Sequence, residues 1–187
     1  DMGVFIISPN DKGGQLFKAP AKVKDATYPL TPIQWNARFC LNNPAIHTLS
    51  FGITEKKHFE EMKGIFPTTS PWSQKDYETK VKLDSFVHDD PYAAYDGFEL
   101  QNDPSGINIP EVLRLRRLWK AYDMIDFAKY RYKTFKEKSH WFPGELPTQN
   151  NLDKINTSKI PAHIPLKELL AETHKNLYKV EYTLAKS

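Results

Sequence analysis

Two short stretches of the sequence carry residue types suited to binding phosphate groups. In residues 8–14, Ser8 offers a hydroxyl donor, and Gly13-Gly14 allows the backbone to approach a phosphate closely. Residues 52–54 lead into a predicted helix, whose free N–H groups attract anions. Cations follow there: Lys56, Lys57 and His58. These residue types are able to bind phosphate groups. Ordinary strand-to-helix loops have the same composition, and the residues alone favour that structural interpretation.

Three other patterns have a structural explanation as well as a chemical one. His88-Asp89-Asp90 contains metal-ligand types, but a neighbouring proline and the lack of a second histidine at helical spacing favour a solvated loop. We expect Cys40 to be a small core residue of an apolar helix rather than a nucleophile. Basic residues alternate with aromatic ones through residues 114–138, as in surfaces that bind nucleic acid or acidic proteins. Helical periodicity turns those aromatics inward, so we expect a solvated basic face and no nucleic-acid partner.

The composition is that of a folded chain with one or two small domains. The 187 residues are 40% hydrophobic and 13% aromatic, with a net charge of +3. A single cysteine, Cys40, excludes an internal disulfide framework and any cysteine-based cluster or zinc site. No run approaches the roughly 18 apolar residues of a membrane span. We therefore expect no membrane partner and a cytoplasmic location.

Strands and helices alternate through residues 1–67. Val4-Phe5-Ile6-Ile7 predicts a strand buried on both faces, as in a parallel sheet. Such a strand needs neighbours on each side, so we expect the chain to be the C-terminal part of a larger fold. Residues 46–51 predict a second strand, which Gly52 ends. The alternation indicates an α/β protein with a parallel sheet.

Two helices are predicted in the same region from their end residues. Thr31 and Gln34 form a capping box around Pro32, which favours the first helical position. Thr54 is expected to cap a second helix that Gly64 closes.

Residues 68–187 are predicted to be mostly helical, after a linker at residues 68–71. One helix begins at Pro110, another runs from Ile125 to about Phe135, and a last one starts at Pro165. The first has apolar residues at helical spacing, namely Leu115, Leu118, Trp119 and Tyr122.

Several segments, in order, resemble the aldo-keto reductases that carry a C-terminal ferredoxin-type domain. Residues 2–9 with Gly13-Gly14 are similar to their seventh barrel strand and its loop. Residues 38–52 are similar to their seventh helix and eighth strand, and Phe59-Glu60-Glu61 to the last barrel helix. In the second region the likeness is carried by residues 106–110, 140–144 and 164–170.

The resemblance implies a fold and two segments. Residues 1–67 would form the last βα units of a TIM (β/α)8 barrel, and residues 68–187 a mostly α-helical, ferredoxin-like domain. Two strands cannot close a barrel, so the implied partner is an N-terminal barrel segment, from the same parent chain or a separate polypeptide. The family reduces carbonyl substrates with NADPH, and its catalytic residues lie on earlier strands. No catalytic residue is therefore assigned here.

The resemblance also implies which residues hold the nucleotide. In the family, the loop after strand seven lies along the pyrophosphate, and the turn after strand eight binds the adenosine end. The corresponding residues are Ser8, Asn10, Gly13, Gly14, Phe51, Gly52, Ile53, Thr54, His58 and Glu61. Thr54 stands where the family usually has a basic residue for the 2′-phosphate, so NADP(H) is implied without selection against NADH.

No iron–sulfur cluster is expected in the second region. Cluster-bearing members have four cysteines before the last helix, in the spacing C-x₂-C-x₂-C-x₃-C-P. Aligned on Pro161, those positions are Asn150, Asp153, Asn156 and Ile160, which offer no sulfur.

Two functions remain open from the sequence. In the first, the chain is the C-terminal portion of an aldo-keto-reductase-like oxidoreductase and contributes nucleotide-binding loops without the catalytic residues. In the second, it is a non-catalytic interaction or structural subunit derived from such an enzyme. Its first strand would then pair with another chain.

Overall fold

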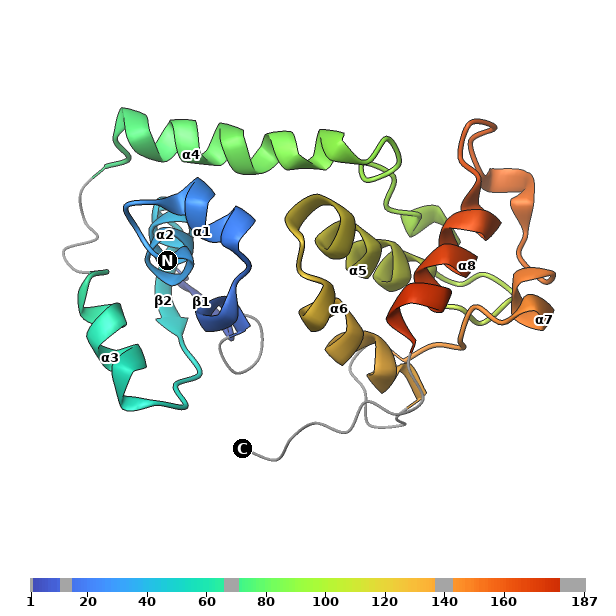
Figure 1. Cartoon of the computed structure of the whole chain (residues 1–187), viewed down its shortest axis with the longest axis horizontal. Helices are drawn as coiled ribbons and strands as arrows, with labels where there is room; N and C mark the ends of the chain where they lie inside the picture. The colour runs from blue at the N-terminus through green and yellow to red at the C-terminus, as the bar shows by residue number, and fades with distance from the viewer. Residues whose placement is uncertain (1, 11–14, 66–70, 137–142, 179–187) are drawn as a thin grey trace. The chain divides into compact units, whose positions relative to one another are not determined.

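The computed structural model describes residues 2–10, 15–65, 71–136 and 143–178 (Figure 1). It divides into two compact units, Asp1–Phe86 and Val87–Ser187. The boundary predicted near Pro67 falls outside the described residues.

Unit 1 contains both strands of the structure's sheet and four helices. Its elements in order are β1 (Val4–Ile7), a 3₁₀ turn (Gln15–Lys18), α1 (Ala21–Thr27), α2 (Pro32–Leu41), β2 (Ile46–Ser50), α3 (Lys56–Lys63) and α4 (Gln74–Ser85). Its core is small: Ile33, Ala37 and Ile65 are buried, and a few half-buried side chains pack on them.

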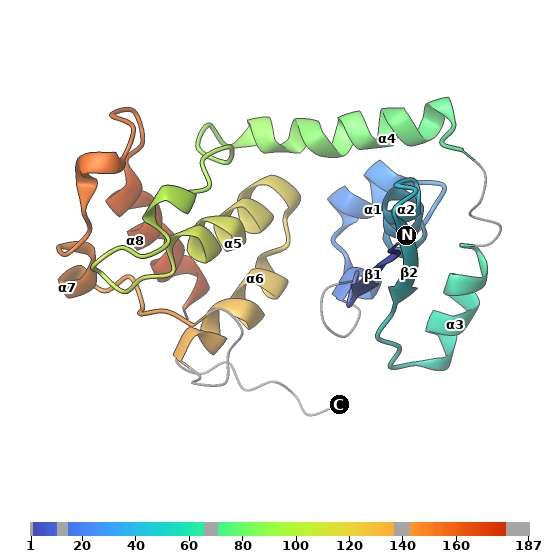
Figure 2. The same ribbon diagram turned by 180° about the vertical axis from the view of Figure 1, so that it is seen from behind.

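Unit 2 is helical around a larger core. Its helices are α5 (Ile109–Tyr122), α6 (Ile125–Tyr132), α7 (Gln149–Leu152) and α8 (Leu166–Leu177). Short 3₁₀ turns follow α6 at Lys133–Lys136 and α7 at Thr157–Lys159. Two more precede α5, Phe86–Asp89 at the unit boundary and Phe98–Leu100. Helices α5, α6 and α8 pack together in both views (Figure 2). Side chains from all four helices meet in one apolar cluster.

The end signals of α2 are confirmed in full. Thr31 is the N-cap, its hydroxyl accepts from the Gln34 N–H at 3.3 Å, and the Gln34 side chain accepts from the Thr31 N–H at 3.1 Å. The helix then buries Ile33 and Ala37 completely. Local chemistry starts this helix, and its apolar face fixes it in the unit.

The predicted parallel pairing is confirmed, whereas the predicted burial of the first strand is wrong. β1 and β2 are parallel, with Ile6 opposite Leu49 and Ile7 opposite Ser50. Yet the β1 side chains of Val4, Phe5 and Ile7 are 47%, 59% and 60% exposed. Among the described residues, neither β2 nor the helices of unit 1 cover these β1 side chains.

The predicted fold class is also wrong. The described residues are mostly helical and hold a single two-stranded sheet, which matches neither the last βα units of a TIM barrel nor a ferredoxin-like domain. The strand–helix–strand order occurs, but it is not extended by further strands in the described residues. In unit 2, extended pairing is limited there to a bridge between Ile107 and Glu145. The described part of unit 2 is built from the packed helices α5, α6 and α8 and not around a sheet.

An ion pair joins α2 to α4 in unit 1. The Arg38 guanidinium donates to both carboxylate oxygens of Asp76, at 2.9 and 2.8 Å. Asp76 also accepts from the Ser73 N–H and hydroxyl at the start of α4. The hydrogen bond from Arg38 is the main cause that lowers the pKa of Asp76 to about 2. This carboxylate therefore positions α4 and caps it at once.

We predict that Asp76→Asn lowers the free energy of unfolding at pH 7 by about 1–2 kcal/mol. The folded-state pKa lies below the ordinary 3.8, so the contribution is present above about pH 4 and is lost as the pH falls toward 2. Urea unfolding followed by tryptophan fluorescence measures this free energy. The difference in free energy of unfolding between variant and wild type should become smaller as the pH falls over that range.

Asp84→Asn is the matched control, since Asp84 lies on the same helix and pairs with Lys80 on an exposed face. Its effect should stay below about 0.5 kcal/mol. Equal losses from the two variants would contradict the account.

Candidate functional site

The carboxyl ends of β1 and β2 bring the two predicted loops together. Because the strands are parallel, the segments that follow β1 and β2 leave the sheet at the same edge. The Ser8 N–H donates to the Ser50 carbonyl oxygen at 3.0 Å, which holds the start of one loop against the other. Six of the ten predicted nucleotide residues follow these strand ends, namely Ser8, Asn10, Phe51, Gly52, Ile53 and Thr54.

The first loop contains a turned backbone and a buried amide. Ser8 has φ 55°, a left-handed conformation that is uncommon outside glycine and turns the chain away from β1. Asn10 is only 1% exposed. Its Oδ1 accepts from Asn36 Nδ2 at 3.3 Å, and the same Nδ2 donates to the Pro9 carbonyl at 2.8 Å. Asn10 Nδ2 is buried and has no acceptor in the described part of the chain. An acceptor on a ligand would satisfy this donor.

The second loop differs from the prediction at the start of α3. Its N-cap is Glu55, so the expectation that Thr54 caps the helix is wrong. The Glu55 carboxylate lies 2.7 Å from the Lys57 ammonium, a contact that lowers the pKa of Glu55. A carboxylate at this end competes with any phosphate for the helix N–H groups. The anion-binding role predicted for the start of α3 is therefore weakened.

Two further predicted residues serve the interior of unit 1. His58 is 3% exposed, and its ring stacks on Phe17 with centroids 3.5 Å apart. The His58 Nδ1 accepts from the N–H groups of Thr54 and Glu55, at 3.4 and 3.3 Å. The Glu61 carbonyl accepts from Gln34 Nε2 at 2.9 Å, which ties α3 to α2. Gly13 and Gly14 lie outside the described residues.

The positions aligned with the family's cluster cysteines take part in ordinary packing and turn formation. Asn150 lies on α7, and Asp153 ends that helix and accepts from Gln149 Nε2 at 2.8 Å. The Asn156 N–H donates to the buried Asp103 carboxylate at 2.9 Å, and Ile160 packs against the apolar core of unit 2.

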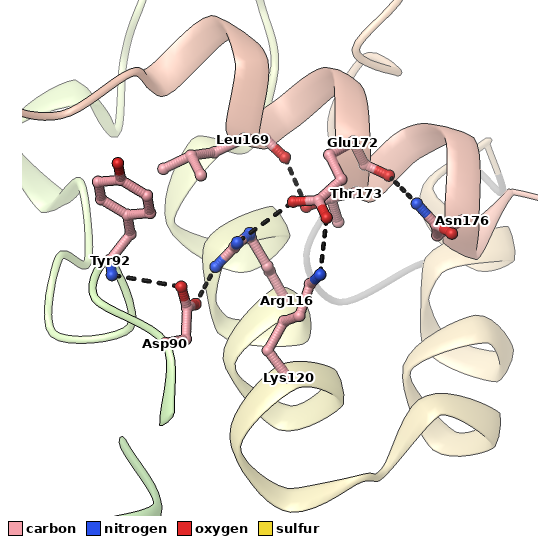
Figure 3. Close-up of polar contacts among 8 residues, drawn as sticks. All are labelled: Asp90, Tyr92, Arg116, Lys120, Leu169, Glu172, Thr173 and Asn176. Carbon is pink, nitrogen blue, oxygen red and sulfur yellow. Dashed lines mark hydrogen bonds and ion pairs between the residues drawn. The ribbon is translucent and has the colours of Figure 1, made fainter. Parts of the chain in front are cut away.

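A network of charges inside unit 2 was missed by sequence reasoning (Figure 3). The Arg116 guanidinium on α5 contacts the Asp90 carboxylate and donates to Glu172 on α8 at 3.2 Å, while Lys120 donates to Glu172 at 2.6 Å. Asp90 and Arg116 are 6% and 5% exposed. Asp90 also accepts from the Tyr92 N–H at 3.3 Å.

This network corrects two expectations in part, since His88 and Asp89 are exposed as expected and several basic residues of 114–133 are half-exposed. Asp90 was expected in a solvated loop, and residues 114–138 were expected to present a solvated basic face. Asp90, Arg116 and Arg131 are buried instead. The inward direction of Tyr132 and Phe135 is confirmed, at 0% and 3% exposure. Helical spacing could not locate Asp90, because its partner lies 26 residues away.

Other groups of the described chain offer little reactive chemistry. No set of three histidine, cysteine, aspartate or glutamate residues could hold a metal ion there. Cys40 is half-buried, and burial raises the pKa of its thiol. None of the helices described could cross a membrane. What remains is the strand-end edge of unit 1 and the charged interior of unit 2.

The chain matches no family model, no curated protein and no solved structure. The resemblance to aldo-keto reductases therefore stays a hypothesis that rests on the sequence segments alone.

We predict that Asp90→Asn costs about 2–4 kcal/mol of unfolding free energy, because it leaves the buried Arg116 cation with weaker compensation. Glu172→Gln should cost less, about 1 kcal/mol, since the Glu172 side chain is 39% exposed and water replaces its contacts. Urea unfolding of the two variants measures both values. A larger loss for Glu172→Gln would show that Asp90 is not the principal counterion.

Proposed function

We propose that this chain is the non-catalytic, nucleotide-holding portion of an NAD(P)H-dependent oxidoreductase that acts on a carbonyl substrate, similar to an aldo-keto reductase. One observation supports this above the others: the loops after β1 and β2 leave the same edge of the sheet, and Asn10 keeps a buried amide donor there without an acceptor in the described residues. Ligands of parallel sheets bind at such edges.

In this proposal the two loops bind different parts of the dinucleotide. Ser8 and Asn10 supply a hydroxyl and an amide for the pyrophosphate oxygens, while residues 51–54 border the adenosine end. Glu55 at the start of α3 repels a phosphate, so the dinucleotide phosphates face the first loop. Hydride transfer is assigned to residues of the partner, since the family's catalytic positions have no counterpart in this sequence.

The proposal includes a partner that covers β1. Val4 N–H and Ser8 N–H donate toward β2, so by strand alternation the N–H groups of Phe5 and Ile7 point to the opposite edge. An isolated two-stranded sheet is marginal in water. The implied partner supplies a strand, either from the same parent polypeptide or from a separate chain.

A second candidate function is a non-catalytic interaction subunit that binds no nucleotide. The observation that favours it is the apolar surface of β1, where Phe5 and Ile7 are 59% and 60% exposed, together with the carboxylate at the start of α3. Such an edge is a template for pairing with another chain.

A charge-gain variant tests the nucleotide site. Thr54 is exposed and stands where the resemblance puts the partner of the 2′-phosphate. In the native particle that contains the full chain, Thr54→Lys should raise the preference for NADPH over NADH about tenfold, about 1.4 kcal/mol. Titrations of both nucleotides, followed by nicotinamide fluorescence, give the two Kd values.

Asn42→Lys is the control, because Asn42 is exposed at the end of α2, just before β2, and so lies away from the carboxyl ends of the strands. It should leave the preference unchanged. No binding of either nucleotide at millimolar concentration, or equal gains from the two lysines, would overturn the nucleotide proposal. In that case, a native mass showing this chain held by another polypeptide would support the interaction subunit.

A further inference from the structure

Two arginines of unit 2 lack the acceptors that neighbouring arginines have. The Nε atoms of Arg117 on α5 and Arg131 on α6 are buried and have no hydrogen-bond partner among the described residues. In the part of the chain that the structure describes, neither guanidinium has an ion pair, a side-chain hydrogen bond or a ring contact.

The neighbours on α5 show what a satisfied arginine looks like in this unit. Arg114 donates to both carboxylate oxygens of Glu111, at 2.7 and 2.8 Å. Arg116 contacts Asp90 and Glu172. The Arg116 Nε is also without an acceptor, but its terminal nitrogens are paired. In the residues that the structure describes, no such carboxylate pairs with Arg117 or Arg131.

Burial makes the missing counterion costly. Arg131 as a whole residue is 6% exposed, which leaves its guanidinium little contact with water. A buried cation without a partner is unfavourable, and proteins ordinarily pair it or bind an anion to it. Tyr132, the next residue, is completely buried, so the helix cannot turn Arg131 outward without exposing the core.

The surrounding charge favours an anion. Residues 114–133 contain seven lysines and arginines against two aspartates, and both aspartates, Asp123 and Asp126, are exposed. Asp123, in a left-handed conformation, ends α5 just before α6 begins, and the two helices lie against each other in Figures 1 and 2. Carboxylates outside this stretch, those of Glu111, Asp90 and Glu172, pair with Arg114, Arg116 and Lys120. The cations left without a described counterion include Arg117 and Arg131, which come from two packed helices.

We propose that Arg117 and Arg131 form part of a binding site for a small phosphate-bearing anion in unit 2. A guanidinium offers N–H donors in a planar fork that matches a phosphate group. The anion supplies the acceptors that the described residues do not. This site is in a different unit from the proposed nucleotide edge and does not depend on it.

Side-chain NMR of the full chain tests the site directly with inorganic phosphate. The Nε–H signals of Arg117 and Arg131 should shift and saturate with one common midpoint, at constant ionic strength held with sodium chloride. The Arg114 signal is the internal control, because its Nε–H already donates to Glu111, and it should stay in place. Shifts that grow without saturation, or equal shifts of all three signals, would show ionic screening only and overturn the proposal.

Substitutions give a second readout. Phosphate should raise the Tm of wild type and of Arg114→Gln by the same amount, and should raise that of Arg117→Gln by less than half as much. Arg131→Gln should behave like Arg117→Gln. If Arg131→Gln fails to fold, the phosphate-induced Tm shift of Arg117→Gln tests the site by itself, since Arg117 is only half-buried. An undiminished phosphate effect in Arg117→Gln would overturn the site.

Discussion

The parallel pairing of β1 with β2 is the constraint on which the first unit depends. Parallel strands require a long crossover, which α1 and α2 provide, and they place both strand ends at one edge. The same pairing uses only one edge of β1. Its other edge and the side chains of Val4, Phe5 and Ile7 are left to solvent in the described chain, while the cluster of buried residues around Ile33, Ala37 and Ile65 is small. The strand that creates the candidate site is therefore also the strand with an unpaired edge and exposed apolar side chains in the described chain.

The second unit is stabilised by a large apolar core. Its helices bury one large apolar cluster, and Leu115, Leu170 and Tyr132 are completely inaccessible. Each such side chain stabilises the unit by roughly 1.5–3 kcal/mol through removal from water. The buried charge of Arg116 is paired, because its guanidinium contacts the carboxylates of Asp90 and Glu172. Among the described residues, the buried Arg131 differs from Arg116 because no carboxylate pairs with it.

Local chemistry was predictable and tertiary surroundings were not. The capping box of Thr31 and Gln34 acts over three residues, so the sequence indicates α2 correctly. The start of α3 was predicted one residue too early, at Thr54, because the ring of His58 binds the N–H groups there. Four apolar residues in β1 suggested burial on both faces, but burial depends on other elements. Helix α4 lies in the region predicted to be mostly helical, but its bounds were not predicted, since it has no apolar stripe and is held by Arg38 from 38 residues away.

Sequence reasoning reached the candidate site only in part. The order of strands and loops identified the edge around Ser8 and Gly52, and the buried amide of Asn10 could not be known without the fold. His58 was assigned to the nucleotide because of its residue type, yet its surroundings turn it into the interior. Asp90 and Arg116 show the same limit, because neither residue type nor spacing reveals a contact across 26 residues.

Amide hydrogen exchange of the full chain tests the central claim, that β1 is incomplete without another strand. In the chain alone, the Phe5 and Ile7 amides should exchange nearly as fast as an unfolded peptide, while the amides of α8 around Leu170 exchange slowly. In an assembly of this chain with a partner that adds a strand to β1, hydrogen exchange of the Phe5 and Ile7 amides should slow by at least a hundredfold. Protection of Phe5 and Ile7 in the isolated chain equal to that of α8 would contradict the account.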